Sequence, residues 1–267
     1  MSASEISILP VKGFEAFKQL EDLQRKAWGM DDLDIIPTHA MYAAEEAGGQ
    51  ILCAFLPSGE PIGFSLAFLA HDKANREKYL YSHMMGIVPE FQSRDFGFQL
   101  KMAQKKHALT ENIQRIDWTY DALLTRNANL NIRKLGGKVR TFHQNLYGRV
   151  RSDLYGDVLT DRFIVSWNLT SAIPVAFPTD VTPITTVRES RPHLISSALT
   201  SGYDNLEFIV PLDHATMRKT DPTRARAWQD AVRAVSAQLL NGEYEITSFR
   251  INNSDESGSY LFQRVRK

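Results

Sequence analysis

The twelve residues IVPEFQSRDFGF (Ile87–Phe98) decide the fold of this chain. An extended run over Tyr79–Val88 stops at Pro89, a short polar turn follows, and a helix is predicted to begin at Gly97. A strand that ends where a helix begins leaves several backbone N–H groups at the positive end of the helix dipole. Such a terminus favours a phosphate or a pyrophosphate, so we expect an anion-binding turn here.

The spacing of Gln92, Asp95 and Gly97 resembles the Gln/Arg-x-x-Gly-x-Gly/Ala signature of the GNAT N-acyltransferases, and the preceding Ile87–Pro89 also fits that family. The resemblance implies an enzyme that uses acyl-CoA. It departs at Asp95, where the family usually has Gly. Asp also adopts the left-handed backbone conformation, so the turn can form. Its carboxylate would oppose a pyrophosphate unless the side chain points outward or pairs with Arg94.

Composition excludes several classes of protein. The chain has 267 residues, and its 31 basic and 31 acidic side chains give no net charge, so it lacks the basic surface of a nucleic-acid-binding protein. The first residues do not read as a signal peptide, and the longest apolar run, Ile62–Ala70, is too short to span a membrane. A single cysteine, Cys53, excludes an internal disulfide and reads as a small buried side chain. We expect a cytoplasmic protein without membrane or nucleic-acid partners.

Periodicity predicts the elements of a first domain over residues 1–168. In order they are a strand over 4–9, helices over 14–28 and 37–46, strands over 50–55, 62–70 and 79–88, a helix over 97–109, a strand over 116–120, a helix over 126–135, and strands over 138–147 and 161–167. This order resembles that of the GNAT fold. The expected fold class is therefore α+β, with a central mixed, mostly antiparallel sheet flanked by helices.

A connector over 169–205 is predicted because Thr170–Pro192 holds four prolines and many Ser and Thr residues. Beyond it, residues 206–267 read as a small β-α-β-β extension whose helix, Pro222–Leu240, carries an apolar stripe that includes Trp228. Asp221 before Pro222 is a suitable N-cap. We expect this extension to pack on the first domain, since two or three short strands cannot bury such a stripe alone.

The resemblance assigns the acyl-CoA contacts. Backbone groups of Ile87 and Val88 would pair with the pantetheine amides, Gln92 would shape the turn, and Lys101 and Lys105 would reach the 3′-phosphate or remain solvated. Asn127 would contact CoA or only solvate its helix. The amides that would hold the pyrophosphate belong to Ser93, Arg94, Asp95, Phe96 and Gly97.

The candidate catalytic residues are His83, Tyr81 and Tyr147. Alternation along the strand places Tyr81, His83 and Met85 on one face and Ser82, Met84 and Gly86 on the other. His83 has the pKa range of a general base near neutrality, and its alternative is an ordinary half-buried strand histidine. Tyr81 would position substrate or donate a proton. The family's usual helix tyrosine falls on Ile132 here, so Tyr147 is the substitute candidate for the acid, with an interface aromatic as its alternative.

Asp121 and Arg126 are the candidate acceptor-binding residues: Asp121 could meet the amine substrate or pair with Arg126. The segment WTYDALLTRNANLNIRKLGG (Trp118–Gly137) and the tail from Pro211 resemble a long GNAT subgroup, some members of which are associated with N-acylamino-acid racemases. This implies transfer from acetyl-CoA or succinyl-CoA to a small amine or amino acid, with no metal, in a protein that could form a homodimer. The rival hypothesis is a non-catalytic acyl-CoA sensor on the same fold.

Overall fold

The computed structural model describes residues 6–30, 32–148, 159–171 and 173–265. They form two compact units, which we treat separately. The N-terminal unit holds the described residues up to Trp118 together with 168–170, and the C-terminal unit holds 119–148, 159–167, 171 and 173–265. No helix among these residues is both long enough and apolar enough to cross a membrane.

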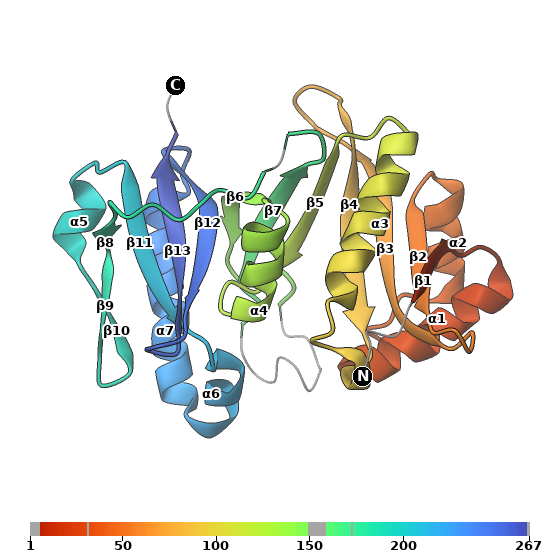
Figure 1. Cartoon of the computed structure of the whole chain (residues 1–267), viewed down its shortest axis with the longest axis horizontal. Helices are drawn as coiled ribbons and strands as arrows, with labels where there is room; N and C mark the ends of the chain where they lie inside the picture. The colour runs from red at the N-terminus through yellow and green to blue at the C-terminus, as the bar shows by residue number, and fades with distance from the viewer. Residues whose placement is uncertain (1–5, 31, 149–158, 172, 266–267) are drawn as a thin grey trace. The chain divides into compact units, whose positions relative to one another are not determined.

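The N-terminal unit is a mixed sheet with helices on both faces (Figure 1). Four antiparallel strands run in the order β1-β2-β3-β4, and β5 then pairs with β4 in parallel because α3 carries the chain back across the sheet. The elements are β1 (Ser7–Pro10), α1 (Phe14–Trp28), α2 (Thr38–Glu46), β2 (Gln50–Phe55), β3 (Pro61–His71), β4 (Lys78–Ile87), a 3₁₀ turn (Pro89–Phe91), α3 (Phe96–Thr110) and β5 (Arg115–Tyr120), of which the last two residues of β5 belong to the C-terminal unit.

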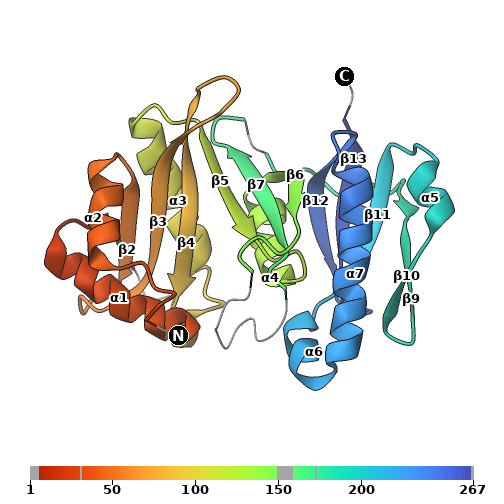
Figure 2. The ribbon, with the colours of Figure 1, turned by 180° about the vertical axis from the view of Figure 1, so that it is seen from behind.

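Helices α1 and α2 cover one face of this sheet, and α3 covers the other (Figures 1 and 2). The ring of Trp28 on α1 meets Phe64 edge to face at a centroid distance of 5.6 Å. On β4, a Cβ added to Gly86 would lie 2.7 Å from the same indole, so glycine allows α1 to approach the strand. Cys53 is buried in this core, and burial raises the pKa of its thiol to about 12, as befits a structural cysteine.

The predicted alternation along β4 is wrong because the strand contains a β-bulge. Ser82 pairs with Ala67 and Met84 pairs with Leu66, so two consecutive residues of β3 face three residues of β4. The extra residue is His83, and it shifts the faces of the strand. Ser82 therefore points toward α3, where Lys101 contacts it, whereas Gly86 lies against Trp28 of α1.

The inward face of α3 is only partly apolar. It consists of Phe96, Leu100, Lys101, Gln104 and Ala108. Ala103 and His107, on the neighbouring part of the helix surface, are half-buried. Because this face includes a lysine and a glutamine, its position along the helix cannot be read from apolar spacing alone.

The C-terminal unit contains a second run of strands in the order β7-β6-β12-β13-β11-β8, and a separate hairpin of β9 and β10. A π-helix, rather than the predicted α-helix, continues α4, as the Leu135 N–H to Leu130 carbonyl bond of 3.0 Å shows. The elements are α4 (Thr125–Ala128), the π-helix (Asn129–Lys134), β6 (Lys138–His143), β7 (Arg162–Asn168), β8 (Thr182–Pro183), β9 (Thr185–Arg188), β10 (Arg191–Leu194), α5 (Ser196–Thr200), β11 (Asn205–Pro211), α6 (His214–Thr220), α7 (Pro222–Leu239), β12 (Tyr244–Asn252) and β13 (Ser257–Arg264).

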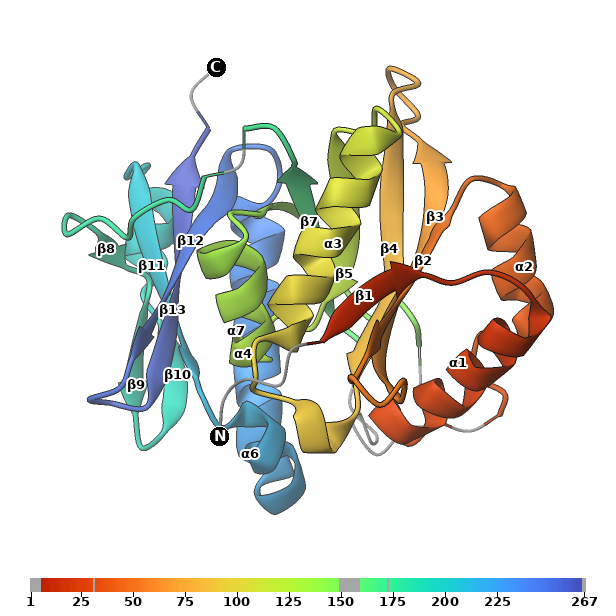
Figure 3. The same ribbon diagram turned by 45° about the vertical axis from the view of Figure 1, so that its right-hand side comes forward.

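Helix α7 lies along the strands β11 and β13, and α6 leads directly into it (Figures 2 and 3). Its start is capped as predicted, because the Arg224 N–H donates to the Asp221 carboxylate at 3.0 Å. Its predicted stripe is confirmed as buried: Ala225, Trp228, Val232, Val235 and Leu239. Helix α6 and the hairpin β9–β10, by contrast, were not predicted.

The tail binds to the segment 119–167 by polar contacts as well as by strand pairing. Arg233 of α7 donates to both oxygens of Asp161, at 2.7 and 3.0 Å. Strand β12 pairs with β6 at Ile246 and Val139. These contacts put β6, β7 and the tail in one compact unit; the domain boundaries at 168 and 205 stay a prediction. The predicted fold class, a mixed sheet flanked by helices, is confirmed.

Candidate functional site

The turn between β4 and α3 has the geometry that an anion site requires. After the 3₁₀ turn Pro89–Phe91, two non-glycine residues, Ser93 and Asp95, have positive φ values of 62° and 65°. The left-handed conformation of Asp95 redirects the chain into α3, which begins at Phe96, one residue before the predicted start. Ser93, Arg94 and Asp95 are exposed. The predicted turn therefore forms with Asp in the position that usually needs Gly.

Gln92 stabilises this turn, as expected. Its side-chain Nε2 donates to the Ile87 carbonyl at 3.0 Å, which links the end of β4 to the residue before the first left-handed one. The guanidinium of Arg94 lies over the Phe91 ring at 5.2 Å from its centroid. Gln92 and Phe91 thus fix the two sides of the turn, while its tip remains exposed.

The first turn of α3 presents backbone donors. The first helical bond runs from the Gln99 N–H to the Asp95 carbonyl at 3.1 Å, so the amides of Phe96 and Gly97 have no acceptor within the helix. The Phe96 side chain is 2% exposed and packs inward, so this residue can offer a ligand only its backbone N–H. The helix dipole adds a partial positive charge at the same place.

At the end of β4, the backbone N–H of Ile87 is open to a ligand, whereas the backbone groups of Val88 are not. Val88 was expected to contact pantetheine, but its N–H donates to Ile62 on β3 at 2.9 Å and its carbonyl accepts from Phe91 at 3.0 Å. This corrects the prediction, because the N–H of Val88 is already used. Strand alternation directs the N–H and the carbonyl of Ile87 away from β3, and this carbonyl already accepts from Gln92 Nε2. Strand β4 pairs with β5 at Leu80 and Tyr81. Among the described residues, the part of β4 from Ser82 to Ile87 does not pair with β5.

His83 and Tyr81 lie together, on the side of β4 that also carries Phe68 of β3. The His83 imidazole is 5.5 Å from the Phe68 ring and stacks on the Tyr81 ring at 6.5 Å, centroid to centroid. Burial lowers the pKa of His83, so its neutral, proton-accepting form predominates at neutral pH. The bulge at this residue sets its direction, which simple alternation could not give.

Lys101 cannot contact a CoA phosphate, and this corrects both alternatives raised for it. The side chain is 2% exposed and points from α3 toward the sheet. Its Nζ donates to Ser82 Oγ at 2.9 Å and to Gln104 Oε1 at 3.0 Å, and it lies 3.9 Å from the Trp118 ring centroid. Burial lowers the pKa of Lys101 to about 7. Lys105 is half-buried on the same helix, and its phosphate contact stays a prediction.

Asp121 is not a free carboxylate. It forms an ion pair with Arg218 of α6, lies 4.0 Å from the Arg162 guanidinium, and accepts the Leu123 N–H at 2.9 Å. The suggested pairing with Arg126 is therefore corrected, whereas contact of Asp121 with the amine substrate stays a prediction. Arg218 is separated from Asp121 by 97 residues, so no local pattern could have indicated it. Arg126 itself is exposed on α4.

Tyr147 and Asn127 also lie in the C-terminal unit. The Tyr147 hydroxyl is 2.9 Å from that of Thr119, and the Arg162 guanidinium lies 5.4 Å from the centroid of its ring. Its side chain is 41% exposed, which leaves the phenol accessible. Asn127 is half-buried in the first turn after Leu124, whose carbonyl accepts its N–H at 2.8 Å. Their predicted acid and CoA-binding roles stay predictions.

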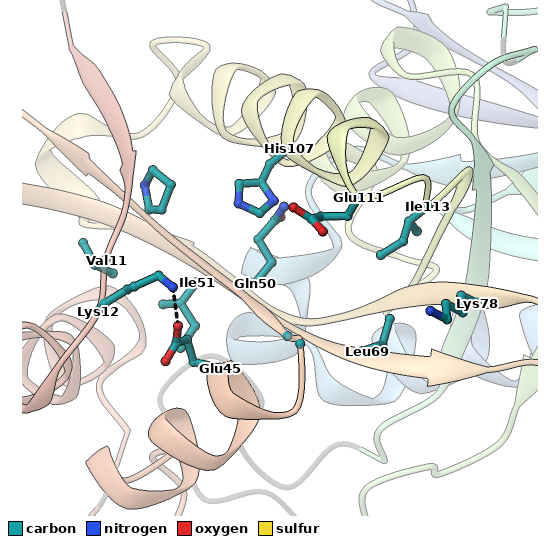
Figure 4. A pocket seen from close by; sticks show the side chains of 13 residues that line it. Val11, Lys12, Glu45, Gln50, Ile51, Leu69, Lys78, His107, Glu111 and Ile113 are labelled. Atoms are coloured by element: carbon teal, nitrogen blue, oxygen red, sulfur yellow. Dashed lines mark ion pairs between the residues drawn. The ribbon is translucent and has the colours of Figure 1, made fainter.

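A pocket of about 250 Å³ lies at the opposite end of β4 and α3 from this turn (Figure 4). In it, Gln50, His107 and Glu111 point toward one another, and Lys12 pairs with Glu45 at 2.7 Å. None of the predicted site residues lines it. The described residues also contain no group of three or more His, Cys, Asp or Glu side chains that could hold a metal ion.

Comparisons with known proteins find similar solved structures. No family model and no curated protein matches the sequence. Solved structures do match, among them a GNAT acetyltransferase from Streptococcus pneumoniae, with 16% identity, 61% of this chain and 99% of that chain covered, and a TM-score of 0.48. A GNAT family acetyltransferase from Elizabethkingia anophelis with acetyl-CoA bound has 15% identity over 61% and 97% of the two chains, with a TM-score of 0.45.

A third match is a chain of the NatC complex bound to Gag peptide and CoA, with 16% identity, 62% and 99% coverage, and a TM-score of 0.49. Two of these three structures are GNAT family acetyltransferases, and two of the three contain CoA or acetyl-CoA. At this level of similarity, the activity has to be argued from the residues of the chain itself.

Proposed function

We propose that this protein is an acyl-CoA-dependent N-acyltransferase of the GNAT type, which transfers an acetyl or succinyl group to the amine of a small molecule, with amino acids among the acceptors. One observation carries the proposal: the turn Gln92–Gly97, with exposed left-handed residues at Ser93 and Asp95, places the start of α3 at the end of β4. The arrangement supports binding of a pyrophosphate by backbone amides, which is what the CoA moiety needs.

The reaction needs an acyl-CoA donor that is held along its pantetheine arm, a neutral amine and a proton acceptor. The amides of Phe96 and Gly97 bind the pyrophosphate, and the outward N–H of Ile87 donates to a pantetheine carbonyl. The amine attacks the thioester carbonyl carbon, a C–N bond forms, the C–S bond breaks, and CoA leaves as a thiolate. His83, kept neutral by burial, takes the proton from the attacking nitrogen.

The acceptor class follows from the resemblance over Trp118–Gly137 and not from a described pocket. Among the solved structures, the NatC complex is bound to a peptide, so a peptide amine is the competing acceptor. A panel of free amino acids, simple amines and short peptides distinguishes the two. Release of free CoA thiol, followed with each acceptor, measures turnover directly.

Gly97 provides the test of the donor site. It lies in the first turn of α3 and is not among the residues with positive φ, so alanine can adopt its backbone conformation and should favour the helix by about 1 kcal/mol. Valine adds two γ-carbons beside the amides. Loss of one charge-assisted hydrogen bond, worth about 1.5–3 kcal/mol, weakens binding about 10- to 100-fold. We expect Gly97→Val to lose acetyl-CoA affinity to this extent and Gly97→Ala to stay within a few-fold.

Calorimetric titration of the two variants with acetyl-CoA checks this, and circular dichroism controls for folding. Equal affinity in wild type and Gly97→Val would remove the turn as the donor site. A second candidate function, an acyl-CoA sensor without turnover, is favoured by Asp95 and by Ile132, which stands where the family has its acid. Tight acetyl-CoA binding with no thiol release across the whole acceptor panel would establish that alternative.

A further inference from the structure

Lys101 is the most unusual ionisable group of the N-terminal unit, and the transfer mechanism does not use it. Lysine is almost never fully buried without a charged partner. Here the side chain is 2% exposed, and its two hydrogen-bond acceptors, Ser82 Oγ and Gln104 Oε1, are both neutral. The Trp118 ring at 3.9 Å supplies the remaining stabilisation of a positive charge.

Every element packed around this amine presents a neutral group to it. Ser82 faces it from β4, Trp118 from β5 and Gln104 from α3. From β2, Gln50 donates to the Gln104 carbonyl at 3.4 Å. Asp117 and Arg115, the charged residues on β5, alternate with Trp118 and lie on the opposite face. Burial alone lowers the pKa of Lys101 to about 7, so its proton is held weakly near neutral pH.

The position of Lys101 along α3 brings this amine close to the anion-binding turn. Lys101 follows Gly97 by four residues, which is one turn and about 6 Å along the helix axis. A pyrophosphate bound at the start of α3 would place at least one negative charge about 10 Å from the amine. In a protein medium this separation favours the protonated amine about tenfold for each negative charge.

We propose that Lys101 takes up the proton that accompanies acyl-CoA binding, so that donor affinity depends on the charge of this buried amine. The inference rests on the proposed donor site at Gln92–Gly97. Lys101 acts as a positioning residue: it does not touch the donor, and its ammonium form binds Ser82, the residue before His83 in the bulge of β4. Donor binding at one end of α3 thereby strengthens the bond that anchors this helix to β4.

The direction of the pH dependence follows from linkage. Donor binding raises the pKa of Lys101, so the complex holds more protons than the free protein at any pH between the two values. Affinity for acetyl-CoA is therefore highest below the pKa of the free protein and falls as pH rises through that window. For one negative charge the expected loss is about tenfold in total, of which about fivefold falls between about pH 7 and pH 9.

Calorimetric titration with acetyl-CoA in two buffers of different ionisation enthalpy measures the number of protons taken up. Acetyl-CoA is the suitable probe because its thioester has no titrating thiol. We expect wild type to take up a large fraction of one proton at about pH 8, and Lys101→Met to take up that much less. Lys106→Met, which removes an exposed positive charge from the same helix, should behave as wild type.

Gln104→Glu tests the proposal without removing the amine. It gives Lys101 a carboxylate at the position of Oε1, and the Nε2 that it replaces has no hydrogen-bond partner among the described residues. The ammonium form should then persist to high pH, and donor binding should take up no proton. Uptake equal to wild type in Lys101→Met, or in Gln104→Glu if the first variant does not fold, overturns the proposal. Acetyl-CoA that does not bind wild type at all overturns the donor site, and this inference with it.

Discussion

Replacing Asp161 by asparagine should destabilise the C-terminal unit by about 3 kcal/mol. The carboxylate is 5% exposed and accepts from Arg233 Nε and Nη2 at 2.7 and 3.0 Å and from the Asn145 N–H at 2.9 Å. Asparagine keeps an acceptor for Asn145 but leaves the guanidinium, 13% exposed, without its buried counter-charge. Breaking a buried pair costs about 3–5 kcal/mol, and we take the lower end because Asp230 lies 3.5 Å from Arg233.

Denaturant unfolding followed by circular dichroism measures the change, and a thermal scan should show a midpoint lower by about 6–12 °C. The matched control is Arg226→Met on the same helix, which removes an exposed pair with Asp230 whose side chains are 52% and 57% exposed. Such a pair contributes less than about 1 kcal/mol. If the free energy of unfolding of Asp161→Asn lies within about 0.5 kcal/mol of wild type, the ion pair does not hold α7 to the residue before β7, and the reasoning fails.

His83→Ala should lower turnover by about 10²-fold. Because burial lowers the pKa of His83, the wild-type rate should fall only when the pH drops below the ordinary pKa range of histidine. The variant should lack this fall at low pH. Activity of the variant within a few-fold of wild type over about pH 6–9 argues against a base role. Cutting the chain after Trp167 should give insoluble or unstable protein, because it removes α7 and β12, the partners of Asp161 and of β6; a soluble fragment that binds acetyl-CoA normally contradicts this. In unliganded wild type, the free energy of unfolding should rise by about 2 kcal/mol from pH 7 to pH 9, since the unfolded state keeps the Lys101 proton that the folded state loses. Lys101→Met should flatten that rise, and an unchanged slope in denaturation at several pH values would exclude Lys101 as its source.

Local signals predicted most of the elements and the anion-binding turn. Pro89 ends a strand and Gly97 allows the first turn of a helix, so residues within the segment itself indicate both ends of the turn. The bounds of α1 and β2 were predicted to the residue for the same reason. Helix α6 was missed because its seven residues give too short a periodic pattern.

The errors at the candidate site come from contacts between residues far apart in the chain. The bulge at His83 exists only through pairing of β4 with β3, so alternation within β4 could not show it. Lys101 is buried because β4 and β5 provide Ser82 and Trp118, whereas its own neighbours suggest a surface helix. Arg218 meets Asp121 only after α6 has packed. Tertiary packing decided each of these positions.

The place of β13 in its sheet has a consequence for how the chain matures on the ribosome. This strand lies between β11 and β12, yet it follows both of them along the sequence. At synthesis rates of about 5–20 residues per second, the edges of β11 and β12 that will receive it stay open until Ser257–Arg264 has emerged. Nascent chains stalled before that point carry two unprotected strand edges, which are templates for association between copies. Stalling sites and rare codons that halt synthesis after β12 and before Ser257–Arg264 has emerged should therefore increase aggregation more than those that halt it before β5.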